Sequence, residues 1–347
     1  MTGLSINAQN TVKAIVNALE NNDIPYVIAR NYENYPDFGH DLDLFYSSSK
    51  PVFDDIAMTV AAECGWDVVT YCDHWSKSPV FEHNIDVYRF YTFDSNEYLQ
   101  VDLFKGFLVW GIPLVSSDEV LRNRELHSSG LFYKPNISIE NIFRLLQINS
   151  LIGNECDVKK VERYRDRVLK YCEIGSESLL EYGKKFGLIY IKESLGSLSM
   201  NDLNQFRFYM NKSKKNFFIK CFYNDPILSL RQLFSRVVEY YRLFHSSPCG
   251  SEISVYVQYE NQKNMVKGEL NRLIDTNFIL CWSELKSKHT YSLKERKVLE
   301  RSGVLVKWVN YVSGDAICLG RDESGDEIFV KLRDYIIFRH EVVYKKK

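Results

Sequence analysis

The feature that most constrains the fold is a pair of aspartates inside an apolar run, Gly39-His40-Asp41-Leu42-Asp43-Leu44-Phe45. The apolar residues predict a β-strand, and side chains on a strand repeat their direction every two residues. Asp41 and Asp43 are therefore expected on one face of the strand. Two carboxylates on one face repel each other unless a positive charge lies near them. Such oxygen ligands suit a divalent cation such as Mg²⁺, whose coordination a substrate phosphate often completes.

A simpler interpretation is that the two aspartates mark the end of a strand and face water. A second strand-like run argues against it, because Leu99-Gln100-Val101-Asp102-Leu103-Phe104 places another acid among apolar residues. A third carboxylate on a neighbouring strand would complete a two-metal cluster for phosphoryl or nucleotidyl transfer. Asp86 is a rival for this position, since residues 83–92 and 98–104 are expected to form a hairpin whose register the sequence leaves open.

The order of helix, short strand, loop, D-x-D strand and later single-acid strand resembles the nucleotidyltransferase-fold superfamily, the DNA polymerase β-like group. A narrower likeness, to a bacterial subgroup, depends on Ala29-Arg30-Asn31-Tyr32-Glu33, Pro36, Asp41-Leu42-Asp43, Leu99–Phe104 and Trp110-Gly111-Ile112. Members of that subgroup often sit among surface-polysaccharide genes, and some carry a C-terminal thymidylate-kinase-like domain. The likeness covers residues 1 to about 115.

The resemblance implies that Asp41, Asp43 and Asp102 are the catalytic residues and the ligands of Mg²⁺ or Mn²⁺. It favours Asp102 over Asp86 as the third carboxylate. It also implies a nucleoside triphosphate or nucleotide-activated donor as substrate, and a small-molecule or glycan acceptor. Association with polysaccharide assembly enzymes is a further expectation from the same resemblance.

One position departs from the superfamily pattern. A Gly-Gly or Gly-Ser pair usually precedes the loop and holds phosphate, whereas this chain has Arg30-Asn31 there. An arginine can bind phosphate through two parallel hydrogen bonds, so Arg30 and Asn31 are expected to bind phosphate. His40 is expected either to orient a phosphate or to cap the strand. The altered pair also leaves a second function open, a non-catalytic scaffold that binds nucleotides or glycans.

Composition limits the partners. With 44 basic and 45 acidic residues the net charge is −1, whereas a dedicated duplex-DNA binder normally carries a clear basic surplus. The longest apolar stretch, Phe107 to Val115, is too short to span a bilayer. The first residues lack the pattern of a signal peptide, and the eight cysteines have no metal-ligand spacing. We therefore expect a cytoplasmic protein without a membrane span that does not bind duplex nucleic acid.

An α+β fold in three parts is expected: a nucleotidyltransferase-like mixed sheet with helices (1–130), a helical domain (131–247) and a smaller α/β domain (248–347). No G-x-x-x-x-G-K-[ST] motif occurs, so the third part is either a diverged kinase-like domain without a P-loop or an unrelated module. Within it, Ile328 to Leu332 is interpreted as a strand.

Two helical segments complete the expectations. The segment Asp157 to Cys172 is rich in lysine and arginine and forms either a solvated face or a basic wall over the phosphate site. The segment Glu177 to Ser199 is interpreted as helical.

Overall fold

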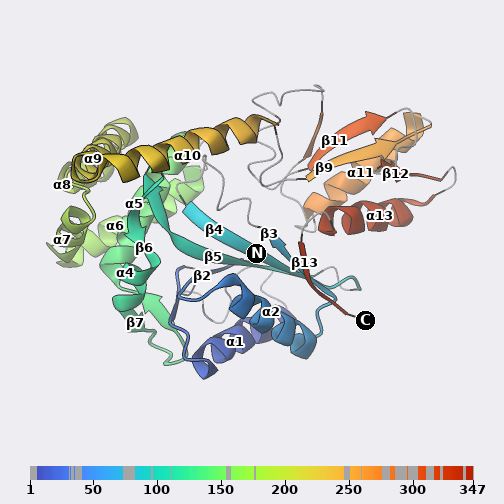
Figure 1. The fold of residues 1–347 in the computed structure, drawn as a ribbon, viewed down its shortest axis with the longest axis horizontal. Coiled ribbons are helices and arrows are strands. Elements are labelled where there is room, and N and C mark those ends of the chain that lie inside the picture. The colour runs from blue at the N-terminus through green and yellow to red at the C-terminus, as the bar shows by residue number, and fades with distance from the viewer. Residues whose placement is uncertain are drawn as a thin grey trace.

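The computed structural model describes most of the chain: residues 6–30, 32, 35, 41–72, 83–94, 97–109, 111–153, 158–175, 177–245, 251–258, 260–275, 282–285, 295, 304–309, 316–320, 323–338 and 341–346. It has the α+β fold that the sequence predicts. A mixed sheet lies at the centre, helices α4 to α10 gather at one end of it, and a smaller α/β unit lies at the other end (Figure 1).

The central sheet contains seven described strands, six of them in the order β1-β2-β5-β4-β3-β13, with β6 pairing β5. Its elements are α1 (Ile6–Asn21), β1 (Tyr26–Ile28), β2 (Asp41–Tyr46), α2 (Lys50–Cys64), β3 (Val68–Cys72), β4 (His83–Tyr91), β5 (Tyr98–Val109), β6 (Ile112–Ser116) and β13 (Glu341–Lys345). The pair β2–β5 is parallel, and the other pairs are antiparallel. The two strands that carry Asp41, Asp43 and Asp102 are therefore direct neighbours.

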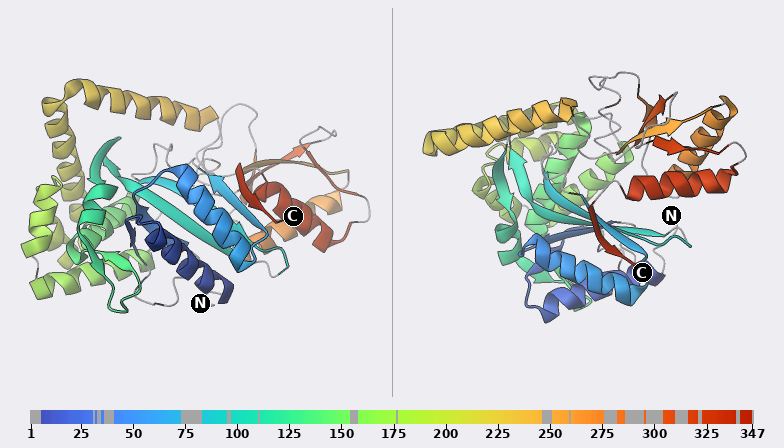
Figure 2. Two further views of the ribbon diagram at one scale, coloured as in Figure 1. Left: turned by 60° about the horizontal axis from the view of Figure 1, so that its bottom comes forward. Right: turned by 45° about the vertical axis from the view of Figure 1, so that its right-hand side comes forward.

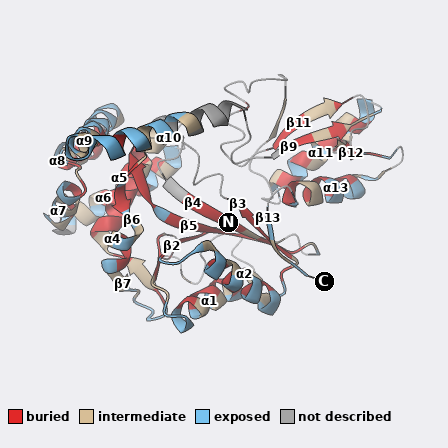
Figure 3. Ribbon diagram, in the orientation of Figure 1, coloured by how far each residue is buried: buried red, intermediate tan, exposed pale blue. Residues whose placement is uncertain are grey.

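Alternation along β2 separates the two faces of this sheet. Leu42 and Leu44 pack in one apolar cluster with residues of α1 and α2, which cover that face (Figure 2). Phe45 packs in a second cluster with residues of α5 and α6 on the opposite face. Because Asp41 and Asp43 alternate with the leucines, they belong to the face of Phe45. The strands of the centre are largely buried, whereas the surface of α10 that Figure 3 shows is mainly exposed.

Local signals in the sequence explain why α2 covers the sheet where it does. Pro51 lies in its first turn, where a missing backbone N–H costs nothing, and Gly65 ends the helix with φ +77°. The buried Trp66 follows, and its Nε1 donates a 2.7 Å hydrogen bond to Thr11 Oγ1 of α1. This contact joins the two helices beneath the sheet.

The helical region begins with a short hairpin that crosses the expected boundary at residue 130. The elements are α4 (Ser117–Arg122), β7 (Arg124–Leu126), β8 (Tyr133–Pro135), α5 (Ile137–Gly153), α6 (Val158–Gly175), α7 (Glu177–Lys185), α8 (Ile191–Ser199), α9 (Leu203–Asn224) and α10 (Pro226–His245). The segment Glu177 to Ser199 forms two helices rather than one. Gly187 causes the break, because it adopts φ +76° and a Cβ there would lie 2.8 Å from the Phe217 ring.

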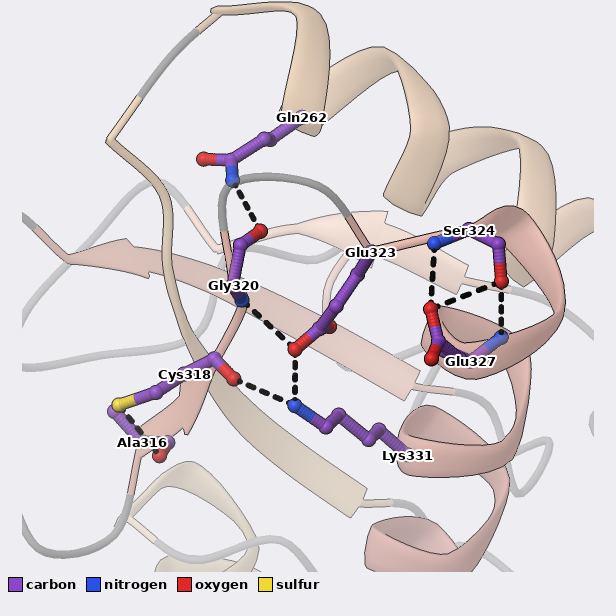
Figure 4. A network of polar contacts seen from close by, with 8 residues as sticks. All are labelled: Gln262, Ala316, Cys318, Gly320, Glu323, Ser324, Glu327 and Lys331. Carbon is purple, nitrogen blue, oxygen red and sulfur yellow. Dashed lines mark hydrogen bonds and ion pairs between the residues drawn. The ribbon is translucent and has the colours of Figure 1, made fainter.

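In the part of the C-terminal unit that the structure describes, four parallel strands form a sheet in the order β10-β11-β9-β12, together with helices α11 and α13. Its elements are β9 (Ser251–Tyr256), α11 (Glu260–Asp275), β10 (Trp282–Glu284), β11 (Val304–Val309), β12 (Ala316–Cys318) and α13 (Gly325–Ile337). The prediction of a strand from Ile328 to Leu332 is wrong, because this segment lies in α13. A capping box starts that helix: Ser324 Oγ accepts from the Glu327 backbone N–H, and the Glu327 carboxylate accepts from the Ser324 N–H (Figure 4).

The last strand belongs to a different sheet from the rest of the expected third part. Strand β13 leaves the α/β unit and pairs antiparallel with β3, so that Glu341 lies opposite Tyr71. Val68 and Tyr91 of the central sheet also join the apolar cluster of the α/β unit. The N-terminal sheet therefore includes residues from both ends of the chain. In the part of the chain that the structure describes, no helix has the length and apolar character to cross a membrane.

Candidate active site

The register of β2 and β5 brings two of the predicted carboxylates together. Asp43 lies directly opposite Asp102, and Asp41 lies opposite Gln100. Neighbouring strands are about 4.8 Å apart, and paired residues point to the same face. Asp43 is fully buried, Asp102 is 3% exposed and Asp41 is partly exposed. Together Asp41, Asp43 and Asp102 form a row of acids, called the carboxylate row below.

The rival position faces the other side of the sheet. Asp86 lies opposite Leu103 in the β4–β5 register, whereas Val87 lies opposite Asp102. Leu103 belongs to the apolar cluster beneath α1 and α2, so Asp86 belongs to that face too. Its carboxylate forms an ion pair with Lys105 at 2.5 Å. The register shift between Asn84 and Ile85 comes before Asp86, so it does not change the face of the sheet on which Asp86 lies.

Arg30 is the cation nearest to the carboxylate row on the β1 side. Its Nη2 donates to Asp43 Oδ1 at 2.6 Å, and its Nε donates to Asp43 Oδ2, which makes a bidentate ion pair. The backbone N–H of Ala29 donates to the Asp43 carbonyl at 2.8 Å and so fixes the approach of Arg30 to the strand. Burial lowers the pKa of Arg30, but the charge and hydrogen bonds of Asp43 more than offset this, and the net pKa is raised.

The other two carboxylates are poorly compensated. Burial is the main reason that the pKa of Asp102 lies well above its usual value, and the charges of Asp43 and Asp41 add to the rise. The pKa of Asp41 is raised by burial and by Asp43, although Arg30 lowers it in part. Asp102 Oδ1 accepts a 2.9 Å hydrogen bond from Gln100 Nε2, and Gln100 Oε1 accepts from Arg89 Nε at 3.0 Å. The acids thus repel each other as the sequence predicts.

The donor set fits a divalent cation in its chemistry. Asp41, Asp43 and Asp102 supply hard oxygen ligands on one face, and a cation would compensate their repulsion. Within the described residues, however, no group of three or more His, Cys, Asp or Glu side chains has the spacing of a metal site. Both oxygens of Asp43 bind Arg30 in this arrangement, so a metal at Asp43 has to compete with the guanidinium.

A cavity of about 220 Å³ adjoins the carboxylate row through Arg30. Its lining combines arginines with aromatic rings and a few other polar groups: Ala29, Arg30, Phe45, Phe104, Phe107, Glu140, Phe143, Arg144, Gln147, Arg163, Tyr164 and Arg167. We call it the arginine cavity. The Phe45 and Phe143 rings stack with centroids 5.2 Å apart, and the Arg30 guanidinium lies 5.7 Å from the centre of the Phe104 ring. The cavity therefore has an apolar floor and a positively charged wall.

A buried polar network supports the wall of the cavity. The Tyr32 hydroxyl donates to the Glu140 carboxylate, and the Arg144 guanidinium donates to its other oxygen. All three side chains are at least nine-tenths buried. Burial raises the pKa of Glu140, although Arg144 partly counteracts the rise. Sequence reasoning missed Glu140 and Arg144; the available signal was an i,i+4 acid–base pair on an otherwise apolar helix.

The basic helix contributes part of its charge to the cavity. Arg163 and Arg167 of α6 line it, four residues apart on one face. Lys159 is exposed, and Arg165 instead binds Asp166 and Asn201. Part of this helix is therefore a solvated face, whereas its role as a basic wall over a phosphate site stays a prediction.

The remaining predicted site residues, Asn31 and His40, lie outside the described residues. Arg30 does lie at the site, where it binds Asp43. Comparisons of this chain with protein-family models, with curated proteins and with solved structures found no match. Function therefore has to be inferred from the site residues themselves.

Proposed function

We propose that this protein is a cytoplasmic, metal-dependent nucleotidyl- or phosphoryl-transferase that acts on a small-molecule or glycan acceptor. The observation that carries the proposal is the pairing of Asp43 with Asp102 on adjacent parallel strands, beside an arginine-lined cavity. Carboxylates that share a face and lie next to guanidinium groups suit a substrate that carries both a metal and phosphates. The glycan acceptor and a role in surface-polysaccharide biosynthesis are drawn by analogy with the subgroup that the sequence resembles.

The residues have distinct roles in this proposal. Asp41, Asp43 and Asp102 would hold Mg²⁺ or Mn²⁺, which supplies Lewis-acid activation of the transferred phosphoryl group. Arg30 presents donors that fit a carboxylate and a phosphate equally well, so it can exchange Asp43 for a phosphate oxygen of the donor. Asp41 is the partly exposed member of the row and so lies at its solvent side.

Nucleotide binding tests the proposal first. Thermal unfolding of the full chain is measured with nucleoside triphosphates and nucleotide sugars, each with and without Mg²⁺ or Mn²⁺. A ligand present at a hundred times its Kd stabilises the folded protein by about 2.7 kcal/mol, and we expect this effect to require the metal. If Asp43→Asn and Asp102→Asn both kept full metal-dependent nucleotide binding and turnover, the proposal would be overturned.

A second candidate function is a non-catalytic scaffold that binds nucleotides or glycan intermediates. The bidentate Arg30–Asp43 pair favours it, because the protein supplies its own cation to the acid at the centre of the row. The short connection from β9 to α11, residues 257–259, also lacks the glycine-rich sequence that cradles phosphates in a P-loop. Nucleotide binding of equal strength with and without metal, and without turnover, would identify the scaffold.

A further inference from the structure

The arginine cavity carries more positive than negative charge. Four guanidinium groups line it against the single carboxylate of Glu140. Asp43 binds Arg30 at the edge of the cavity. Glu140 is likewise engaged by Arg144 and by Tyr32. Arg163 and Arg167 of α6 thus supply two of the four guanidinium groups in the lining.

These two arginines differ in depth. Arg163 is exposed, with its guanidinium 5.5 Å from the centre of the Tyr164 ring, whereas Arg167 is half-buried. Burial lowers the pKa of Arg167, which means that its charge has lost hydration. An anion that enters the cavity would meet Arg163 at the entrance and Arg167 further in.

The size of the cavity limits the ligand. Pockets for drug-sized molecules measure roughly 300–1,000 Å³, so a cavity of about 220 Å³ takes a small molecule or one end of a larger one. Arginine forks match the tetrahedral oxygens of phosphate with paired hydrogen bonds. The apolar floor, where the Phe107 and Phe143 rings lie 4.5 Å apart, suits the carbon skeleton attached to the phosphate.

We propose that the arginine cavity binds a small phosphate monoester, with its phosphate on Arg163 and Arg167, and that this molecule is the acceptor of the transfer reaction. The acceptor role rests on the function proposed above, whereas the binding of the monoester does not. Arg30 links the two sites, since it lines the cavity and bonds to Asp43 of the carboxylate row.

Calorimetric titration of the full chain with glycerol 3-phosphate and with inorganic phosphate tests the binding. Arg163→Gln and Arg167→Gln each remove one guanidinium group. Each should weaken the binding of glycerol 3-phosphate by about 10- to 100-fold, the usual range for a hydrogen bond to a charged group. Lys159→Gln is the matched control, because it removes one charge from an exposed position on the same helix outside the cavity. Its affinity should stay within about twofold of the original protein.

The result that overturns the proposal is unchanged affinity for glycerol 3-phosphate in the Arg163→Gln/Arg167→Gln double variant. The proposal is also overturned if these variants weaken a non-hydrolysable nucleoside triphosphate and leave the monoester unaffected, because the cavity then belongs to the donor. Far-UV circular dichroism and urea unfolding establish that the variants are folded. Should Arg167→Gln fail to fold, the exposed Arg163 carries the test together with Arg163→Lys, which keeps the charge but loses the fork.

A separate variant distinguishes this inference from the function on which its acceptor role rests. Asp102→Asn should reduce metal-dependent transfer by on the order of a thousandfold. It should leave the affinity for glycerol 3-phosphate intact, because Asp102 is not part of the cavity lining. If transfer fails in Asp102→Asn while phosphate binding persists, the result supports both the transferase function and the phosphate site. Phosphate binding without any transfer in the original protein would overturn the transferase and the acceptor role, and would keep the phosphate site.

Discussion

Asp43 and Asp102 occupy paired positions on adjacent parallel strands, yet their carboxylates have different partners. Arg30 binds both oxygens of Asp43, whereas Asp102 accepts a hydrogen bond from the neutral amide of Gln100. Asp43 is therefore paired directly with a guanidinium, whereas burial, Asp43 and Asp41 outweigh the favourable charges of Arg30 and Arg89 at Asp102. Neutralising the two residues should change the free energy of unfolding in opposite directions.

Asp102→Asn should stabilise the protein at neutral pH. The pKa of Asp102 is raised well above the ordinary value of 3.8 in the folded state, so between these two values the folded state binds more protons than the unfolded state. The free energy of unfolding consequently falls as the pH rises from the ordinary pKa of Asp102 to its raised pKa in the folded state. Above that raised pKa the protein keeps the full loss of stability. Asparagine removes the charge and still accepts from Gln100. Urea unfolding should show a gain at pH 7 that vanishes near pH 4; an equal gain at both pH values would contradict the assignment.

Asp43→Asn should destabilise the protein, because Arg30 loses a bidentate, charged partner in a partly buried position. We expect the free energy of unfolding to fall by about 1–3 kcal/mol, the usual cost of leaving a partly buried donor without its partner. Asp41→Asn is the matched control: it makes the same change on the same strand, at a carboxylate whose pKa is raised by burial and by Asp43. Chemical denaturation at neutral pH should show a loss of stability for Asp43→Asn and none for Asp41→Asn, and equal losses would argue against the ion pair.

Asp86→Asn should leave metal-dependent turnover nearly unchanged, because Asp86 lies on the opposite face of the sheet and pairs with Lys105. Asp102→Asn should reduce kcat by on the order of a thousandfold, the cost of losing a metal ligand in the proposed reaction. Initial rates of the two variants, measured side by side at saturating Mg²⁺, compare the two positions. A larger loss in Asp86→Asn would move the active site to the other face.

Removal of residues 341–347 should lower the unfolding temperature, although these residues lie outside both proposed sites. Strand β13 pairs with β3 along the edge of the central sheet, and Glu341 also forms an ion pair with Lys50 of α2. Each lost backbone hydrogen bond costs about 0.5–1.5 kcal/mol, so a loss of several kcal/mol is expected. A control chain that lacks only residue 347 keeps β13 and the hydrogen bond from the Lys346 N–H to the Asp67 carbonyl, and it should unfold near the original temperature. Calorimetry on both chains would reject the pairing if their midpoints agreed.

The alternation of apolar and acidic residues predicted the shared face of Asp41 and Asp43, because direction on a strand follows from local geometry alone. The ends of helix α2 also depend on local geometry, since Pro51 and Gly65 mark them through their own backbone preferences. The prediction of a strand within α13 used only the apolar run, whereas the capping box of Ser324 and Glu327 just before it is the local signal for a helix. Local signals are reliable where they act through the backbone, and ambiguous where a short apolar run fits both a strand and a buried helix.

The sequence by itself determined the acids, their common face and the basic character of α6. Only the tertiary structure decided which further acid joins Asp43, because strand register depends on contacts between segments that are far apart in the chain. Had β5 paired with β2 one residue out of this register, Asp102 would lie on the other face of the sheet and Asp86 on the face of Asp43. It also decided that Arg30 binds Asp43 and that Arg144, Arg163 and Arg167 share one cavity. These groups come from separate helices and a loop, and no local preference of the chain specifies how such elements pack together.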